Sequence, residues 1–198
     1  MFVKVCGITN PEQAYEISQL VDYVGFIFHP GSPRFVSHSF PSMKAKKVGV
    51  FVNVPIQELI QTAILEKLDS VQLHGNEKPE YCAALNKQVL VIKSFGIDEA
   101  FDFNGLKAYE PFVDYFLFDT KTSQHGGSGK QFDWHLLQKY SGSTPFILSG
   151  GLRPEIVPQI QEVKHPQLKG IDLNSGFESQ PGIKNILLLK QFLHEFNN

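Results

Sequence analysis

Two titratable side chains stand at the ends of apolar runs in this 198-residue chain, where they could take part in acid–base chemistry. Cys6 ends the run Phe2–Cys6, and Asp119 ends the run Tyr115–Asp119. A thiol has an ordinary pKa of about 8.5, so Cys6 can act as a base if its site lowers that value, and otherwise it is an inert buried thiol. Burial would raise the pKa of Asp119 and make it a proton donor, whereas a helix-capping role would favour the ionised carboxylate. The residue types alone leave these alternatives open.

Two glycine-containing loops and one arginine have the composition of anion-binding sites. Ser149-Gly150-Gly151 and Asn174-Ser175-Gly176 would let backbone N–H groups approach a phosphate closely, and a short helix that follows adds its positive N-terminal end. The alternative is that the glycines only permit tight turns. Arg34 follows Ser32-Pro33, and its planar guanidinium suits a substrate carboxylate unless it is an ordinary surface arginine. We therefore expect one phosphate and one carboxylate to be bound.

His74 and Cys82 indicate a function less directly than the residues above. His74 follows the apolar run Ser70–Leu73 and is either a polar core residue or a catalytic one. Cys82 lies inside a helical pattern, which favours packing. The two cysteines are far apart and lack the spacing of metal ligands, so we expect no metal site and a reducing, cytoplasmic setting.

Short apolar runs alternate with longer amphipathic segments along the whole chain. The runs are nearly continuous in apolar residues, as in parallel strands that are covered on both faces. The expected strands are Phe2–Cys6, Val21–Phe28, Lys47–Val52, Ser70–Leu73, Val89–Lys93, Tyr115–Asp119, Pro145–Leu148 and Leu168–Leu173. The expected helices are one that Asn10 caps and Pro11 begins, Val54–Lys67, Lys78–Asn86, Phe132–Lys139, Pro154–Val163 and Ile183–Phe196. Helix is less clearly indicated after the second and fifth strands, and Asn104-Gly105 interrupts the latter segment.

These alternating elements predict an α/β fold, a single (β/α)8 TIM barrel that spans residues 1–198. The chain is short for this fold, whose lower limit is about 200 residues, so the connections must be lean. Chemistry in such barrels takes place at the carboxyl ends of the strands. The unusual polar residues and glycines of this chain follow the apolar runs at that same end, and the opposite ends carry no comparable pattern.

The composition narrows the classes of partner. Hydrophobic residues make up 42% of the chain and charged residues 19%, with a formal net charge of -2. A near-neutral chain of this kind gives no support for nucleic acid or a membrane surface as the main partner. No run approaches the roughly 20 apolar residues of a membrane span, and the N-terminal residues do not form a signal peptide. A small phosphorylated molecule is the expected partner, and the oligomeric state stays open.

The motifs at the strand ends, in their order along the chain, resemble the phosphoribosylanthranilate isomerase family of tryptophan biosynthesis. The resemblance runs from end to end and is specific because so many short motifs keep one order. The matching stretches are Lys4-Val5-Cys6-Gly7-Ile8-Thr9, Gly25-Phe26-Ile27-Phe28, Ser32-Pro33-Arg34, Val48-Gly49-Val50-Phe51-Val52-Asn53, Val71-Gln72-Leu73-His74-Gly75, Leu117-Phe118-Asp119-Thr120, Gly126-Gly127-Ser128-Gly129-Lys130, Phe132-Asp133-Trp134, Ser149-Gly150-Gly151-Leu152, Asp172-Leu173-Asn174-Ser175-Gly176-Phe177-Glu178 and Pro181-Gly182.

The resemblance implies the Amadori rearrangement of N-(5-phosphoribosyl)anthranilate to 1-(o-carboxyphenylamino)-1-deoxyribulose 5-phosphate, without a metal or other cofactor. By analogy Asp119 is the acid that opens the ring, and Cys6 is the base that removes the C2 proton. The residues that we expect to bind substrate are Arg34, Gly150, Gly151, Asp172, Ser175 and Gly176. Asn174 stands where the family often has serine, which would reduce the phosphate contacts, and Asn185 stands where aspartate is common, which affects only a helix start.

Two other functions compete with this interpretation. The related aminoaldose isomerase of histidine biosynthesis would be expected to have an aspartate at the end of the first strand, where this chain has Cys6. A barrel that only binds a sugar phosphate needs neither Cys6 nor Asp119. Both residues therefore favour the phosphoribosylanthranilate isomerase reaction.

Overall fold

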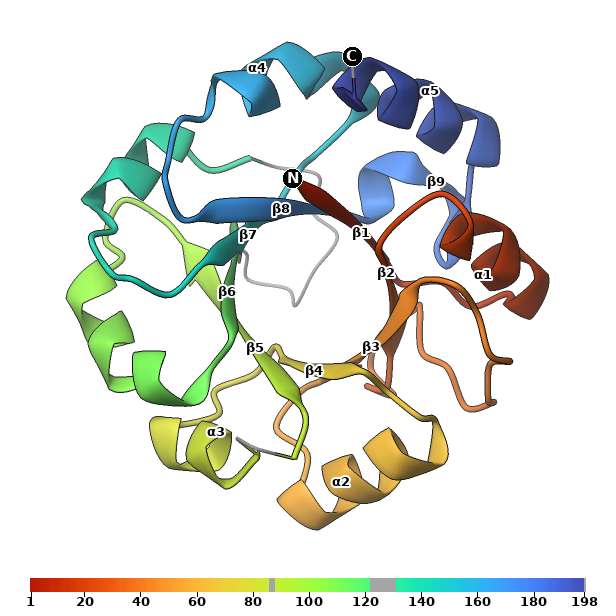
Figure 1. Ribbon diagram of the computed structural model, residues 1–198, viewed down its shortest axis with the longest axis horizontal. Coiled ribbons are helices and arrows are strands. Elements are labelled where there is room, and N and C mark those ends of the chain that lie inside the picture. The colour runs from red at the N-terminus through yellow and green to blue at the C-terminus, as the bar shows by residue number, and fades with distance from the viewer. Residues whose placement is uncertain (86–87, 122–130, 198) are drawn as a thin grey trace.

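The strands of the chain close into a parallel β-barrel surrounded by helices (Figure 1). The structure is a computed structural model, and it describes residues 1–85, 88–121 and 131–197. The barrel strands follow one another around the ring in chain order, and β8 closes it by pairing with β1. They are β1 (Phe2–Cys6), β2 (Tyr23–Ile27), β3 (Lys46–Phe51), β4 (Ser70–Leu73), β5 (Leu90–Ile97), β6 (Tyr115–Thr120), β7 (Phe146–Leu148) and β8 (Leu168–Leu173). The predicted barrel is confirmed.

The two-residue period of the strands separates an inner from an outer core. Val48, Ile92, Leu117 and Ile147 come from four different strands and pack together in the barrel interior. The alternate strand residues face outward and join the helices in a larger apolar cluster. This alternation also assigns the polar residues of each strand to a face, and it places Lys4 inside the barrel with Cys6.

The outer layer consists of α-helices and shorter 3₁₀ helices. The α-helices are α1 (Pro11–Ser18), α2 (Ile56–Leu65), α3 (Pro79–Leu85), α4 (Val157–Glu162) and α5 (Ile186–Asn197). The 3₁₀ helices are η1 (Phe103–Ala108), η2 (Glu110–Phe112), η3 (Trp134–Lys139), η4 (Pro154–Ile156) and η5 (Ser175–Phe177). As predicted, Asn10 caps α1 by accepting a hydrogen bond from the Gln13 N–H at 2.8 Å, and Pro11 occupies the first turn.

Several predicted helices are shorter or tighter than expected. The segment Phe132–Lys139 forms only the 3₁₀ helix η3. The segment Pro154–Val163 divides into η4 and α4, because Pro158 has no N–H to donate to the carbonyl of Pro154 and an α-helix cannot run through both turns. Asn104-Gly105 does not interrupt its segment but lies within η1. Such short helical connections are what a (β/α)8 barrel of 198 residues requires.

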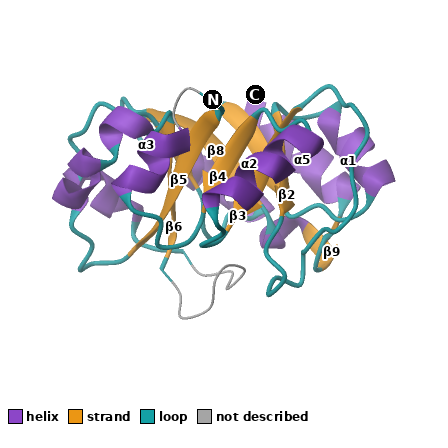
Figure 2. Ribbon diagram, turned by 90° about the horizontal axis from the view of Figure 1, so that it is seen from below, coloured by secondary structure: helices purple, strands orange, loops and turns teal. Residues whose placement is uncertain are grey.

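The segment that begins at Ile183 starts with a strand, not with the predicted helix. The strands β9 (Glu178–Gln180) and β10 (Ile183–Lys184) form a small antiparallel hairpin before α5. Gly182 permits the turn because its φ of 87° lies in the left-handed region. Figure 2 shows β9 at the opposite end of the barrel from the two chain termini, so the hairpin stands beside the carboxyl ends of the strands. Within the described ranges, none of the helices has both the length and the apolar character that crossing a bilayer requires.

Candidate active site

Cys6 occupies a space in the barrel that a glycine leaves open. The thiol is the last residue of β1, is only 3% exposed, and pairs in the ladder with Gly25 of β2. A Cβ atom at Gly25 would lie 2.7 Å from the Cys6 sulfur, so any side chain there would displace the thiol. Gly7 then turns the chain away with a φ of 72°. The sequence therefore fixes Cys6 at the barrel mouth through its two glycine neighbours.

An ion pair inside the barrel lies next to the Cys6 thiol. The Lys4 Nζ contacts Asp172 Oδ1 at 2.8 Å, and the Lys4 side chain is completely buried. Burial alone would lower the pKa of Lys4, but attraction to Asp172 and Cys6 outweighs burial and raises that pKa, so the ammonium stays charged. Burial raises the pKa of the Cys6 thiol, while Lys4 and Lys184 oppose the shift. The thiol is thus protonated in the free protein, and the Lys4 and Lys184 ammonium groups favour a thiolate, Lys4 more strongly.

Asp119 has the environment of a proton donor. It lies near the end of β6 with its side chain 22% exposed, and its Oδ1 accepts a hydrogen bond from the Thr120 N–H at 2.8 Å. Burial raises the pKa of Asp119 to about 6, although the Thr120 N–H opposes the shift. The hydrogen bond to the Thr120 N–H lies within β6. The carboxyl therefore holds a proton more strongly than an exposed aspartate does.

His74, which follows β4, lies beside Asp119, and Gln72 of β4 contacts the other nitrogen of its ring. His74 Nε2 stands 3.9 Å from Asp119 Oδ2, and His74 Nδ1 contacts the amide nitrogen of Gln72 at 3.1 Å. His74 and Asp119 both line a pocket of about 490 Å³, which extends over the carboxyl ends of β4, β5 and β6. The position of His74 next to the predicted acid separates it from an ordinary core histidine.

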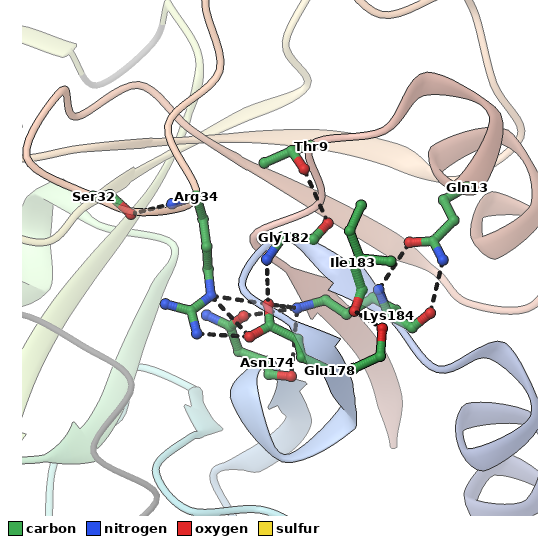
Figure 3. A network of polar contacts seen from close by, with 10 residues as sticks. Thr9, Gln13, Ser32, Arg34, Asn174, Glu178, Gly182, Ile183 and Lys184 are labelled. Atoms are coloured by element: carbon green, nitrogen blue, oxygen red, sulfur yellow. Dashed lines mark hydrogen bonds and ion pairs between the residues drawn. The ribbon is translucent and has the colours of Figure 1, made fainter.

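Arg34 is held on one edge by a carboxylate of the C-terminal hairpin. Its Nε and Nη2 bind Glu178 in a forked arrangement, with the shortest contact at 2.6 Å, and Lys184 binds the same carboxylate at 2.7 Å (Figure 3). Burial alone would raise the pKa of Glu178, but the hydrogen bonds from Arg34 and Lys184 outweigh it and hold that pKa below its usual range. The Arg34 side chain also passes over Gly7, where a Cβ would lie 2.6 Å from Arg34 Cδ. The guanidinium is therefore fixed close to Cys6.

The loops after β7 and β8 have the tight backbone that the glycines predict. Gly150 and Gly151 have φ values of 91° and 67°. A Cβ at Gly150 would lie 2.4 Å from Thr120 Oγ1, and a Cβ at Gly176 would lie 2.1 Å from the Leu152 carbonyl oxygen. The second contact shows that the β8 loop packs closely against the β7 loop. The predicted phosphate-binding segments are therefore neighbours in space.

The structure brings the sequence-predicted residues to one end of the barrel and adds partners that the sequence analysis missed. The missed residues are Lys4, Gly25, Glu178 and Lys184. Lys4 gives a signal in the sequence, because it shares the period-two face of Cys6 within an otherwise apolar strand. Glu178 and Lys184 give no such signal, because they meet Arg34 only through the fold. The predicted stretch Gly126–Lys130 lies outside the described residues.

The two residues that depart from the expected pattern have defined contacts. Asn174 Oδ1 accepts a hydrogen bond from Lys184 Nζ at 2.8 Å, so this side chain belongs to the network around Glu178. Asn185 Oδ1 accepts from the Leu188 N–H at 3.1 Å at the start of α5, which agrees with an effect limited to a helix start. Cys82 is completely buried in α3.

Comparisons with known proteins indicate one family. Residues 3–195 match the family model described as N-(5′-phosphoribosyl)anthranilate (PRA) isomerase. A Parabacteroides distasonis protein named N-(5′-phosphoribosyl)anthranilate isomerase is 47% identical over 205 residues, which cover 98% of this chain and 93% of the relative. A crystal structure of phosphoribosyl anthranilate isomerase from Thermotoga maritima is similar with a TM-score of 0.84 and 36% identity, covering 100% of this chain and 98% of that one.

A further solved structure is of phosphoribosyl anthranilate isomerase in complex with reduced 1-(o-carboxyphenylamino)-1-deoxyribulose 5-phosphate. It is similar to this chain with a TM-score of 0.81 and 33% identity, covering 100% of this chain and 98% of that one. The family model extends over nearly all of the chain, and the identities hold over its full length. By sequence and by fold, the chain belongs to the N-(5′-phosphoribosyl)anthranilate isomerase family.

Proposed function

We propose that this chain converts N-(5′-phosphoribosyl)anthranilate into 1-(o-carboxyphenylamino)-1-deoxyribulose 5-phosphate, with Asp119 as the general acid and Cys6 as the general base. One observation carries the assignment of these roles. Cys6 ends β1 and Asp119 lies near the end of β6, so the parallel barrel brings a thiol and a carboxyl from different strands to the same end, close to the buried Lys4–Asp172 ion pair. A barrel that only binds a sugar phosphate requires neither the Cys6 thiol nor the Asp119 carboxyl at this position.

The first step belongs to Asp119. Its carboxyl donates a proton to the furanose ring oxygen while the bond between C1 and that oxygen breaks, and the nitrogen lone pair forms the iminium of a Schiff base. A donor must keep its proton near neutral pH, and a pKa of about 6 for Asp119 serves that purpose better than the ordinary value of 3.8. The burial of the Asp119 carboxyl, which raises its pKa, thus supports the acid role.

The second step belongs to Cys6. A thiolate removes the C2 proton, the C2–H electron pair forms the C1–C2 double bond, and the iminium nitrogen accepts the displaced electrons. The resulting enolamine then tautomerises to the ketone. Burial holds the thiol protonated in the free protein, so the thiol must release its proton to solvent before this step, and the iminium cation formed beside it adds to the positive charge of Lys4. Both charges favour the thiolate at the stage that needs it. A base of this kind must stay reduced, so a cytoplasmic place of action is part of the proposal.

The remaining residues would hold the two anionic ends of the substrate. Arg34 binds Glu178 along one edge, and we assign the opposite edge of the guanidinium to the anthranilate carboxylate. Gly150, Gly151, Ser175 and Gly176 would surround the phosphate with the backbone of the last two loops. Asp172 would reach the substrate with the part of its carboxylate that Lys4 does not occupy. The solved relative binds reduced 1-(o-carboxyphenylamino)-1-deoxyribulose 5-phosphate, which supports a phosphorylated ligand at this end of the barrel.

Turnover of the purified substrate tests the proposal directly. The fluorescence of the anthranilate group is followed after addition of the parent protein, of Asp119→Asn and of a His135→Leu control, whose side chain is exposed on η3. The parent and the control should convert the substrate, whereas Asp119→Asn should bind it without turnover. Binding without turnover by the parent protein would instead identify a sugar-phosphate-binding barrel.

A further inference from the structure

Gln72 of β4 and His74, which directly follows this strand, form a polar pair that the reaction described above does not yet use. Gln72 is a strand residue that is only 2% exposed, and His74 follows two positions later, so both side chains point to the same side. Burying an amide is costly unless it forms hydrogen bonds. The Gln72 amide nitrogen contacts His74 Nδ1 at 3.1 Å, so Gln72 is arranged to hold the imidazole.

This contact selects one form of the neutral imidazole. Because the Gln72 amide nitrogen is a donor, His74 Nδ1 must accept, and the single ring proton of neutral His74 is on Nε2. That nitrogen is the one that faces Asp119, at 3.9 Å from Oδ2. The other carboxyl oxygen, Oδ1, already accepts from the Thr120 N–H. A shift of about 1 Å would bring the imidazole N–H within hydrogen-bond range of Oδ2.

We propose that His74 is a positioning residue for Asp119, which donates its Nε2–H to Oδ2 when the carboxyl ionises, and that Gln72 fixes the tautomer in which it can do so. The inference rests on the proposed acid role of Asp119. When the Asp119 O–H bond breaks, the proton goes to the ring oxygen and a carboxylate is left in a poorly hydrated place. The imidazole N–H stabilises that carboxylate and keeps its own proton throughout.

Among the residues that the structure describes, the other charged groups near Asp119 have partners. Lys4 and Asp172 form the ion pair below it, and both act on Asp119 electrostatically. In the pocket that Asp119 shares with His74, Lys93 contacts Glu77 at 3.2 Å and Lys121 contacts Asp98 at 2.6 Å. Since these cations are engaged by other carboxylates, the imidazole is the side-chain donor that the geometry of the described residues assigns to Oδ2.

Nitrogen NMR of the parent protein tests the tautomer without any turnover. Protein labelled with ¹⁵N in histidine, in the absence of substrate, should show His74 protonated on Nε2 and unprotonated on Nδ1. Gln72→Met should remove this preference and give a mixture of tautomers, whereas Gln57→Met, an exposed control on α2, should not. A parent protein with the proton on Nδ1 would overturn the proposal, whatever its activity.

Kinetics test the effect on Asp119. His74→Leu should lower kcat by about tenfold with KM within a factor of two, and the limb of the pH profile that belongs to Asp119 should move to higher pH, because the carboxylate loses a donor. His74→Gln should recover most of the loss, because its amide N–H reaches the position of Nε2, and it also guards against a variant that fails to fold. Parental kcat and pH profile in a folded His74→Leu protein would overturn the inference. Full activity of Asp119→Asn would instead overturn the proposed function.

Discussion

The acid role that we propose for Asp119 comes with a cost in stability, and one substitution should affect the two differently. We expect Asp119→Asn to lower kcat by about 10²-fold or more, because an amide cannot deliver a proton to the ring oxygen. The amide oxygen still accepts from the Thr120 N–H, so the local hydrogen bond of the parent protein is kept. Steady-state kinetics and thermal denaturation on one preparation measure both effects.

The raised pKa of Asp119 also sets how the stability of this variant depends on pH. The native state binds the Asp119 proton more tightly than the unfolded chain does, since the pKa is about 6 in place of 3.8. The parent protein therefore loses stability as pH rises through this window. A shift of about two units corresponds to about 3 kcal/mol. Asp119→Asn should thus be the more stable protein at pH 7 by up to about that amount, and the gap should close below about pH 4. A variant that is less stable than the parent at pH 7 would show that Asp119 is chiefly structural.

Cys6 gives the second expectation for a single residue. Cys6→Ser should fold, because the smaller hydroxyl fits the space above Gly25, but kcat should fall by about 10²–10⁴-fold, because serine is a far weaker base than a thiol near neutral pH. Cys82→Ser is the matched control, since Cys82 is a buried thiol in α3 away from the barrel mouth. A Cys6→Ser enzyme within a factor of two of the parent kcat would remove Cys6 from the mechanism.

Between neighbouring strands, a missing side chain is as important as the residues that are present. Gly25 of β2 leaves the space that the Cys6 sulfur fills, with an added Cβ only 2.7 Å away. Gly25→Ala should displace the thiol, lower kcat more than it changes KM, and reduce the free energy of unfolding by about 1–3 kcal/mol through overpacking. Gly105→Ala is the control, because nothing lies within 4 Å of its added Cβ. Equal kinetic effects of the two substitutions would contradict this account of Gly25.

Strands and helices were predictable from the sequence where a local pattern of apolar or capping residues sets their bounds. They were not predictable where contacts between segments set those bounds. The apolar runs gave β1, β4 and β8 with the predicted bounds, and Asn10-Pro11 marked the start of α1, because burial and capping act within a few residues. The second strand of the hairpin, Ile183–Lys184, was predicted as the start of a helix, because these two residues continue the amphipathic pattern of α5. Ile183 and Lys184 instead pair with β9, and this pairing between two segments is not visible in the pattern of either segment alone.

At the scale of the whole molecule, the closed barrel makes one site from residues that are far apart in the sequence. Cys6, Asp119 and Arg34 were identified because strand ends carry chemistry in this fold. The Arg34–Glu178 pair spans 144 residues, and no spacing rule connects two positions across the seam of a barrel. The roles assigned to these residues stay predictions until the variants above are measured.

The neighbouring loops of β7 and β8 lead to an expectation for the folded molecule as a whole. A ligand that binds only the native state raises its stability, so inorganic phosphate should raise Tm and compete with substrate, whereas chloride at equal ionic strength should not. Ser175→Ala should weaken both effects of phosphate, because it removes a hydroxyl at the start of η5. Ser141→Ala, at an exposed position, should leave them unchanged. Parental phosphate competition in Ser175→Ala would place the anion elsewhere at the barrel mouth.

The hairpin that binds Arg34 is synthesised after Cys6, Arg34 and Asp119. Arg34 is made early and its carboxylate partner, Glu178, is made late, while Gln13 of α1 exchanges hydrogen bonds with the backbone of Lys184 at 2.7 and 2.8 Å. A nascent chain on the ribosome therefore contains Cys6 long before it contains the segment that steadies its neighbour. Loss of the last few dozen residues to a protease would dismantle the site from its far side, although Cys6, Arg34 and Asp119 would all remain in the fragment.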